Sequence, residues 1–455
     1  MSPETRPDPA WPNALKVGFR FAFSYLALYL YPLSATLGWF WFFWFSWENH
    51  TYEWPWDRLV PWVGAHVLGV GHPIVASASG DSTYSYVKLL CFVLIAALAA
   101  AVWSVLDRKR TSYSRLHQWT RWYVRVVLAF TMIGYGTIKV IPIQMPPPSL
   151  ITLMQPYGDL TPGRHLWTFM GIFPKYEIFC GLMETLAGVL LLIPGMTFLG
   201  AVVALGALVN VWTLSAFYDI PVKLGVGHLV LLASFLLLPD IPRVVNLFVL
   251  KRRVEPERQQ PLFRRRWLNY AVWAGQWAVA LSLIVTTLST GRRTRRETDN
   301  TPVTNPVYGI WLVDEFTLDG QVHPPLLTDS LRWQRVIFDA EQLMRQHTIA
   351  SIQTMSGQYS PYVAVPDPQK GTLWLKSPLE AAMSAPERQL VLQRRPVDPA
   401  VNAELSYHRP AADTMILEGP IKGHQILVRL KKEDRPFALM TRGFHWIIED
   451  NEVAY

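Results

Sequence analysis

Long apolar segments dominate the first 290 residues of the chain. A membrane-crossing helix needs about 20 mostly apolar residues, and the pattern gives seven segments of this kind. They lie near residues 17–45, 84–106, 122–142, 175–194, 196–217, 221–239 and 267–288. The first is interrupted at Pro32 and ends in the aromatic sequence WFWFFWFSW, which is typical of a membrane interface. The pattern predicts an all-α membrane bundle of about seven transmembrane helices.

After residue 300 the pattern changes to short runs in which apolar and polar residues alternate. Gly, Pro, Asp and Asn separate these runs, which is typical of an antiparallel β-meander closed into a barrel. The predicted strands are VYGIWLVDEF, RWQRVIFD, TIASIQTM, GTLWLK, ELSYHR, TMILEG, HQILVRLK and GFHWIIE. A small barrel either holds one apolar ligand or fills its interior with its own side chains. Both alternatives stay open at this stage.

The two patterns together predict four regions. Residues 1–120 form an N-terminal two-span segment, and residues 121–250 form a four-helix membrane domain. Residues 251–299 contain a basic loop, the seventh span and a linker, and residues 300–455 form a soluble external β-barrel domain.

Composition agrees with a membrane protein that has a soluble part. Of the 455 residues, 51% are hydrophobic and only 17% are charged. The formal net charge of +8 does not indicate a nucleic-acid partner, because the basic residues cluster beside apolar runs, as they do on the cytoplasmic side of membranes. The polar, proline-rich start MSPETRPDPAWPNALK predicts no cleavable signal peptide.

Two basic connections determine the predicted orientation. Residues 107–121 hold five Lys and Arg against one acid, and residues 251–266 hold seven against two. The positive-inside rule places both in the cytoplasm, so everything after the seventh span lies outside. The sequence GRRTRRE, just after that span, argues for the opposite orientation, but the two loops outweigh it. We therefore expect a multi-pass protein of a bacterial-type inner membrane with a periplasmic C-terminal domain.

Cysteine and histidine positions limit the chemistry of the chain. Cys91 and Cys180 both fall inside predicted spans, so the external domain has no disulfide and the chain has no C-x-x-C pair. A thiol-relay enzyme of the quinone-reductase type is therefore not expected. No metal site is predicted either, because the histidines show no ligand spacing; those considered are His50, His66, His72, His323, His347, His408, His424 and His445.

Several charged side chains fall inside the predicted spans. A charge in the hydrocarbon costs about 2.5–3.5 kcal/mol even on insertion scales, so such groups normally face one another or a wet cavity. Lys139 is near the outer end of its span, and we predict an ion pair with Glu184 or otherwise with Glu177 or Asp219. Tyr135, one turn deeper, should line the same pocket. The other residues expected at this depth are Asn210, Tyr218, Lys223 and His228.

Two interpretations of these charges stay open. In the first, they are structural ion pairs, and the longer side chains extend to the membrane interface. In the second, they form a polar intramembrane ligand pocket in which Lys139 and Glu184 are the candidate catalytic residues. Small residues would let the helices approach closely; they are Gly134, Gly136, Gly181, Gly188, Gly225 and Gly227.

The proline-rich segment 143–174 separates two predicted spans on the outer side. Its prolines end the preceding helix. Thr161 and Pro162 are then a typical N-cap and first-turn proline for a short helix. This helix is too short to cross the membrane, so we expect it at the interface or as a lid over the charged pocket.

Three sequence motifs carry a resemblance to a known family. GYGTIKV, FCGLMETLAGVLLL and YDIPVKL resemble the four-helix DoxX family, whose fold is distantly similar to the membrane part of vitamin K-dependent carboxylases. The resemblance covers roughly residues 120–250 and implies that Lys139, Glu184 and Asp219 stand at the family's polar positions. The family name comes from a membrane subunit of a thiosulfate:quinone oxidoreductase, which implies an association with quinones.

The C-terminal domain carries a second resemblance. Gly309, Ile310 and Trp311, together with Arg442 before Phe444, are similar to the lipocalin signature. In that signature an arginine covers the first-strand tryptophan by a cation–π contact.

Three functions are compatible with these features. The first is a redox or quinone-associated membrane protein with a partner oxidoreductase subunit, since the sequence has no flavin, haem or iron–sulfur motif for electron transfer alone. The second is a non-enzymatic scaffold or carrier whose barrel binds a lipid or a partner. The third is an enzyme similar to vitamin K-dependent carboxylases, with the lysine as base near a quinol. We consider a quinone as the cofactor of this protein, and we expect membrane lipid to surround its helices.

Overall fold

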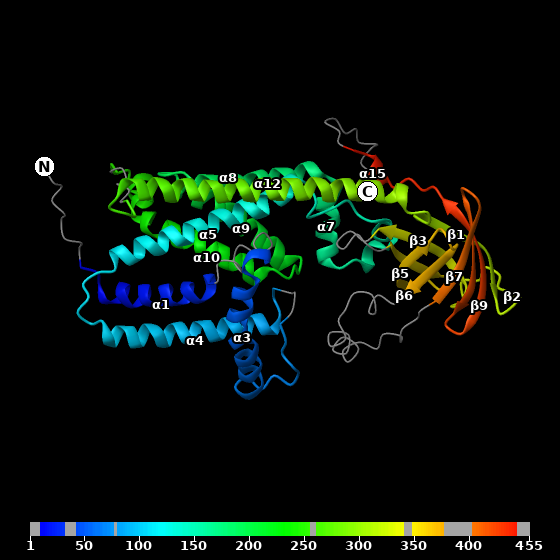
Figure 1. Ribbon diagram of the computed structural model, residues 1–455, viewed down its shortest axis with the longest axis horizontal. Coiled ribbons are helices and arrows are strands. Elements are labelled where there is room, and N and C mark those ends of the chain that lie inside the picture. The colour runs from blue at the N-terminus through cyan, green and yellow to red at the C-terminus, as the bar shows by residue number, and fades with distance from the viewer. Residues whose placement is uncertain are drawn as a thin grey trace. The chain divides into compact units, whose positions relative to one another are not determined.

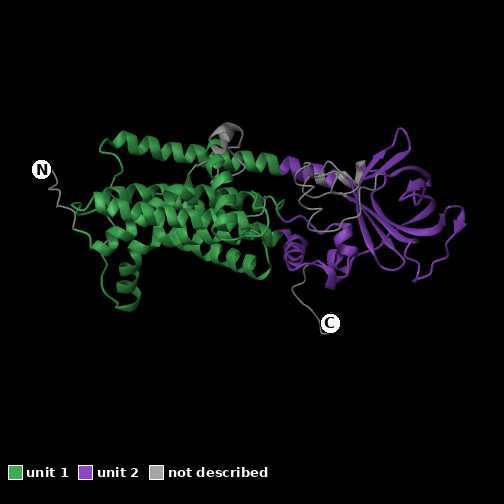
Figure 2. Cartoon of the chain, turned by 90° about the horizontal axis from the view of Figure 1, so that it is seen from below, with its two compact units in different colours: residues 1–144, 175–291 green, residues 145–174, 292–455 purple. Residues whose placement is uncertain are grey.

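The computed structural model describes residues 10–31, 42–76, 80–254, 261–340, 348–376 and 403–443. The chain forms two compact units, and each is treated by itself (Figure 2). Residues 1–144 and 175–291 form a helical unit, and residues 145–174 and 292–455 form a unit that contains a β-barrel.

The helical unit follows the apolar segments of the sequence (Figure 1). Its long helices are α1 (Asn13–Leu30), α3 (Phe42–His66), α4 (Thr83–Leu106), α5 (Ser114–Val140), α8 (Pro174–Leu192), α9 (Thr197–Phe217), α10 (Lys223–Leu237) and α12 (Arg266–Thr304). Three short elements, η3 (Leu238–Asp240), α11 (Ile241–Val244) and η4 (Val245–Val249), continue α10. Helix α12 continues across the boundary between the two units, so GRRTRRE is helical.

Five helices of the described chain are long and apolar enough to cross a membrane. They are Thr83–Leu106, Ser114–Val140, Thr197–Phe217, Lys223–Val249 and Arg266–Glu297. The chain is therefore a multi-pass membrane protein, and five of the seven predicted spans have such a helix among the described residues. The predicted span 175–194 does form α8, a helix of 19 residues that includes three charged ones, Lys175, Glu177 and Glu184. The predicted span 17–45 begins as α1, and its interruption at Pro32 lies outside the described residues.

Helix α3 was not predicted beyond residue 45, where the first predicted span ends. The pattern concealed the helix because Pro55 and Pro61 lie inside it and proline removes a backbone donor and favours a kink.

Helix α5 lies at the centre of the helical unit. Of its most apolar stretch, 72% is buried inside the protein, compared with 22–33% for the other four apolar helices. Val127, Leu128 and Ile133 on α5 belong to one core cluster with residues of α8, α9, α10 and α12. The other apolar helices therefore present much of their surface outward, as helices in contact with lipid do.

The second unit contains nine strands. They are β1 (Gly309–Leu318), β2 (Gln321–Val322), β3 (Trp333–Ala340), β4 (Thr348–Thr354), β5 (Tyr359–Asp367), β6 (Thr372–Lys376), β7 (Ala403–Ala411), β8 (Thr414–Ile421) and β9 (His424–Glu433). Eight of them form an antiparallel barrel that closes where β1 pairs with β9, and β2 is a short addition to β1. Closure removes the exposed strand edges.

Seven of the eight predicted strands are confirmed, and GFHWIIE lies outside the described residues apart from Gly443. The sequence did not predict β5, because it contains Pro361 and Pro366 and proline cannot donate to a strand ladder. Buried side chains from each of the eight barrel strands fill its interior, among them Phe316, Phe338 and Leu405.

Trp311 is fully buried in the barrel core, and its indole Nε1 donates a 2.8 Å hydrogen bond to the carbonyl oxygen of Val307. The cations over its ring are Arg409, at 5.6 Å from the ring centroid, and Lys432, at 6.0 Å. The prediction that Arg442 covers this tryptophan is therefore corrected. Arg442 is exposed and directly follows the short helix α15 (Ala438–Thr441).

Residues 145–174 form α6 (Leu150–Met154), η2 (Tyr157–Asp159) and α7 (Pro162–Ile172). The predicted start of α7 is confirmed: the Thr161 hydroxyl accepts a 3.3 Å hydrogen bond from the Arg164 N–H, and Pro162 is in the first turn. This segment belongs to the barrel unit, where the Ile151 N–H donates to Asp339 Oδ2 at 3.1 Å. Its role as a lid over the charged residues stays a prediction.

Candidate functional site

Lys139 on α5 and Glu184 on α8 form the buried ion pair that the sequence predicted. The Lys139 Nζ donates a hydrogen bond to Glu184 Oε1. Lys139 is 6% exposed and Glu184 is 4% exposed. The pairing prediction is confirmed, and both charges are removed from water together.

Three glycines bring the two helices close enough for this pair. A Cβ atom on Gly181 would lie 2.6 Å from the carbonyl oxygen of Gly136 and 2.7 Å from Lys139 Cβ. A Cβ atom on Gly188 would lie 2.6 Å from the carbonyl oxygen of Ala129. Only glycine fits at these contacts, so the backbones of α5 and α8 touch directly, as small residues at membrane-helix interfaces allow.

Several acceptor oxygen atoms at or near the ion pair accept no hydrogen bond. Glu184 Oε2, Thr185 Oγ1 and Gln144 Oε1 are buried atoms without a hydrogen-bond partner in the described structure. A carboxylate accepts several hydrogen bonds, and a buried acceptor without a donor is costly. This arrangement can accept hydrogen bonds from a small polar group at the second oxygen of Glu184.

Glu177 and Tyr135 lie on the same two helices as the pair. Glu177 is fully buried and precedes Glu184 by two turns, about 10 Å along the axis at ~1.5 Å per residue. Tyr135 is 53% exposed, and its place in one pocket with Lys139 stays a prediction.

Asp219 and Lys223 form a separate pair away from Lys139. Their Oδ1 and Nζ atoms are 2.8 Å apart, and the Asp219 side chain is 84% exposed. The unanticipated partner is Asp81, whose carboxylate accepts the N–H groups of Lys223 and Leu224, each at 2.8 Å. Asp81 therefore caps α10 at its positively polarised N-terminus. These contacts favour the structural interpretation for Asp219 and Lys223.

His228 lies in an aromatic cluster between α1 and α10. Its Nδ1 is 2.6 Å from the carbonyl oxygen of Leu224, and its ring stacks on Tyr29 at a centroid distance of 3.9 Å. Because a carbonyl only accepts, Nδ1 carries the proton, and Nε2 of the neutral ring accepts from the Tyr25 hydroxyl. The buried histidine is thus satisfied by its neighbours. Of the remaining predicted pocket residues, Asn210 and Tyr218 are exposed.

In the barrel, two histidines contact aspartates. His323 Nδ1 is 2.7 Å from Asp329 Oδ2, and His424 Nδ1 is 2.6 Å from Asp319 Oδ2. These hydrogen bonds lower the pKa of Asp329 and of Asp319 below the usual value. Within the described ranges, no cluster of three or more His, Cys, Asp or Glu side chains is positioned to hold a metal ion.

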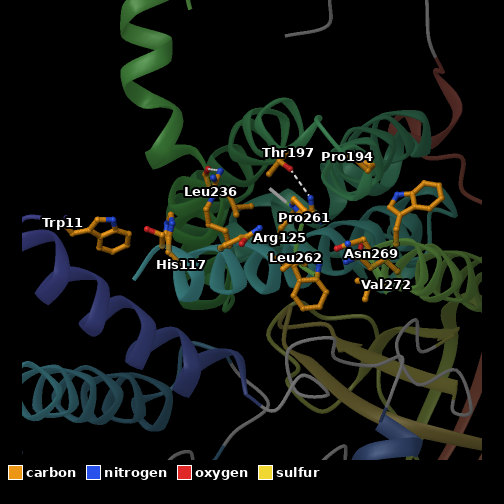
Figure 3. A pocket seen from close by; sticks show the side chains of 16 residues that line it. Trp11, His117, Arg125, Pro194, Thr197, Leu236, Pro261, Leu262, Asn269 and Val272 are labelled. Carbon is orange, nitrogen blue, oxygen red and sulfur yellow. Dashed lines mark hydrogen bonds between the residues drawn. The ribbon is translucent and has the colours of Figure 1, made fainter. Parts of the chain in front are cut away.

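A second polar feature of the helical unit is a cavity of about 620 Å³ toward the start of α5 (Figure 3). Its lining includes two arginines and three tryptophans but no acidic residue. The sequence analysis did not find this cavity, although Arg121 and Arg125 stand one helical turn apart inside an apolar helix. That spacing was the available signal.

Comparison with known proteins finds a similarity to the "Uncharacterized protein YwoB" of Bacillus subtilis (strain 168). The two sequences are 32% identical over 151 residues, which cover 31% of this chain and 84% of YwoB. No family model and no solved structure matches the chain. Because most of YwoB is matched at this identity, the chain belongs to the same family as YwoB.

Proposed function

We propose that this chain is a redox-associated membrane protein that binds the head group of a quinone at Lys139 and Glu184. The observation that carries the proposal is the buried carboxylate of Glu184, which is held by Lys139 through Oε1 and has no hydrogen-bond partner at Oε2. Ionisable groups within a membrane protein are costly and usually mark a functional pathway.

The chemistry of a quinone fits this pair. Reduction of a quinone to a quinol takes up two electrons and two protons. The ammonium group of Lys139 donates a hydrogen bond to one oxygen of the head group, and Glu184 Oε2 accepts the hydrogen bond of a quinol hydroxyl. Glu184 passes on the two protons of the reduction one after the other. The electrons come from a partner oxidoreductase subunit, since the sequence contains no flavin, haem or iron–sulfur motif.

The arrangement of the four central helices supports the resemblance to the four-helix DoxX family. Helices α5, α8, α9 and α10 occupy residues 114–237, and their buried residues share one core. The motif residues Lys139 and Glu184 lie on the first two of these helices. A carboxylase-like enzyme receives less support, because its catalytic base would be Lys139, whose Nζ is engaged by Glu184.

Quinone retained by the purified full-length protein tests the proposal. We expect wild-type protein kept under reducing conditions to retain quinone in its quinol form and Glu184→Gln to retain at least about tenfold less. The reason is that a charge-assisted hydrogen bond, here from the quinol hydroxyl to the carboxylate, is worth roughly 1.5–3 kcal/mol. Solvent extraction followed by chromatography with mass detection measures the quinone per protein. The matched control is Glu297→Gln, which changes a side chain that is 56% exposed on α12 and should leave retention unchanged.

Two outcomes contradict the proposal. One is that the wild-type protein carries no quinone and binds none when it is added. The other is equal retention by Glu184→Gln and wild type when both elute as folded protein.

We propose that the barrel lies outside a bacterial inner membrane and acts as a partner-binding domain rather than a lipid carrier. The filled interior supports this second function, because a carrier needs a hollow barrel. The excess of basic residues in 107–121 and 251–266 supports the orientation.

Protease added to intact spheroplasts should remove residues 300–455 while the helical unit stays protected. Immunoblotting against tags at each end of the chain measures the two parts, and lysed cells provide the control in which both are accessible. A barrel that resists protease in intact spheroplasts but not in lysed cells would reverse the topology.

A further inference from the structure

The cavity toward the start of α5 extends deep into the helical unit. Arg125 is eleven residues after the first residue of α5, about 16 Å along the axis at ~1.5 Å per residue. Gln276 is ten residues after the start of α12, about 15 Å by the same measure. The predicted spans begin at residues 122 and 267, so Arg125 lies three residues and Gln276 nine residues inside them, about 5 Å and about 14 Å at ~1.5 Å per residue.

Several hydrogen-bond donors that line the cavity have no acceptor. Arg125 Nε, Trp122 Nε1 and Gln276 Nε2 are buried nitrogen atoms with no hydrogen-bond partner in the described structure. Gln276 is only 6% exposed. A different nitrogen of Arg125, Nη1, donates a hydrogen bond to Thr197 Oγ1 at 3.4 Å (Figure 3). Three unsatisfied donors around one space indicate a missing acceptor.

The charge distribution indicates that this acceptor is an anion. No aspartate or glutamate lines the cavity. Arg121 lies 3.5 Å from Asp240, and that carboxylate also pairs with Arg243 at 3.0 Å. For Arg125 no carboxylate of the described chain lies within ion-pair distance. A guanidinium with a buried nitrogen and no counterion is costly, whereas an arginine beside a phosphate forms short, charge-assisted bonds.

Part of the cavity wall is apolar. Trp11, Trp273 and Val272 contribute to the apolar surface. Arg115 donates hydrogen bonds to the carbonyl oxygens of Pro261 and Leu262, two residues that line the cavity. A ligand with a charged head and an apolar body therefore matches both parts of the lining.

We propose that this cavity binds the phosphate head group of an anionic membrane lipid. Arg125 pairs with the phosphate oxygens, Trp122 and Gln276 donate further hydrogen bonds, and the acyl chains leave along the tryptophan-lined wall. Basic pockets between transmembrane helices bind anionic lipid head groups in this way. The site is separate from Lys139 and Glu184, so it does not depend on the proposed quinone function.

Lipid titration of the full-length protein in a neutral detergent tests the site. The probes are short-chain phosphatidylglycerol, phosphatidylcholine of the same chain length, and inorganic phosphate, and isothermal titration calorimetry measures the binding. We expect saturable binding of phosphatidylglycerol and weaker binding of phosphatidylcholine. Arg125→Gln should weaken phosphatidylglycerol binding about ten- to a hundredfold, as the loss of one charge-assisted hydrogen bond predicts.

Two further variants keep the test decisive. Arg264→Gln removes an exposed charge near the same loop without lining the cavity and should change the affinity less than twofold. Gln276→Leu removes a donor while keeping the side-chain size, and it should weaken binding severalfold even if Arg125→Gln fails to fold. Equal affinities for the two lipids, or equal effects of Arg125→Gln and Arg264→Gln, would overturn the proposal. Binding of inorganic phosphate alone, with the same dependence on Arg125, would overturn the lipid assignment and leave a site for free phosphate.

Discussion

Replacing Glu184 with leucine is expected to lower the free energy of unfolding of the helical unit by about 3–5 kcal/mol, the range for breaking a buried ion pair. The change leaves the ammonium group of Lys139 in a buried site with its counterion removed. Replacing Lys139 with methionine strands the carboxylate of Glu184 and should cost a similar amount. Unfolding of the full-length protein in a mixed-micelle denaturant titration measures both changes.

The double variant Lys139→Met, Glu184→Gln distinguishes the two interpretations of this pair. It has no buried charge at the contact, so it should recover most of the stability lost by either single change. If the site has the proposed function, the double variant folds but retains no quinone. A matched control is Asp219→Asn, which breaks an exposed pair and should cost no more than about 1 kcal/mol. A Glu184→Leu protein as stable as wild type would remove both interpretations.

Trp311→Ala is expected to lower the free energy of unfolding of the barrel by about 3–5 kcal/mol, the usual cost of truncating a buried tryptophan. The ring is fully buried, and its N–H bond to Val307 is lost as well. Residues 300–455 expressed alone provide the system, because the barrel core is formed entirely by residues 307–430 and the sheet closes on itself. We expect a soluble monomer with β-type circular dichroism, which then reports unfolding in guanidinium chloride.

Trp374→Ala provides the control for that measurement. Trp374 is a partly exposed tryptophan on β6 that is not part of the barrel core, so its removal should cost much less. Equal effects of the two substitutions would show that Trp311 has no special role in closing the barrel.

The sequence predicted the Lys139–Glu184 pair because the energetics of a membrane leave few alternatives. A lysine and a glutamate at similar depth, each followed or preceded by glycines on the same face, can lower their cost by meeting. The barrel strands were predictable for a comparable reason, since alternation of apolar and polar residues reports which face is buried. In both cases the pattern of residue types lies within short segments of the sequence, and the burial of one face of each segment causes that pattern.

The features that sequence reasoning missed depend on contacts between distant segments. Trp311 lies under Arg409 because β7 and β9 have a particular register with the rest of the barrel, and no motif records that register. The basic cavity combines side chains from residue 11 to residue 276. The sequence analysis counted Arg121 in the cytoplasmic connection 107–121 and did not single out Arg125, and that both line one cavity became visible only with the helices packed.

The distance along the chain between Lys139 and Glu184 has a consequence for how the protein is made. The two residues are 45 positions apart, so α5 is synthesised before the carboxylate that neutralises its lysine exists. During that interval an unpaired charge on α5 costs about 2.5–3.5 kcal/mol and favours retention beside the insertion machinery. Arrival of α8 removes this cost at once and lets the glycine faces of the two helices close. We therefore expect release of the helical bundle into the lipid to become favourable only after both helices are present.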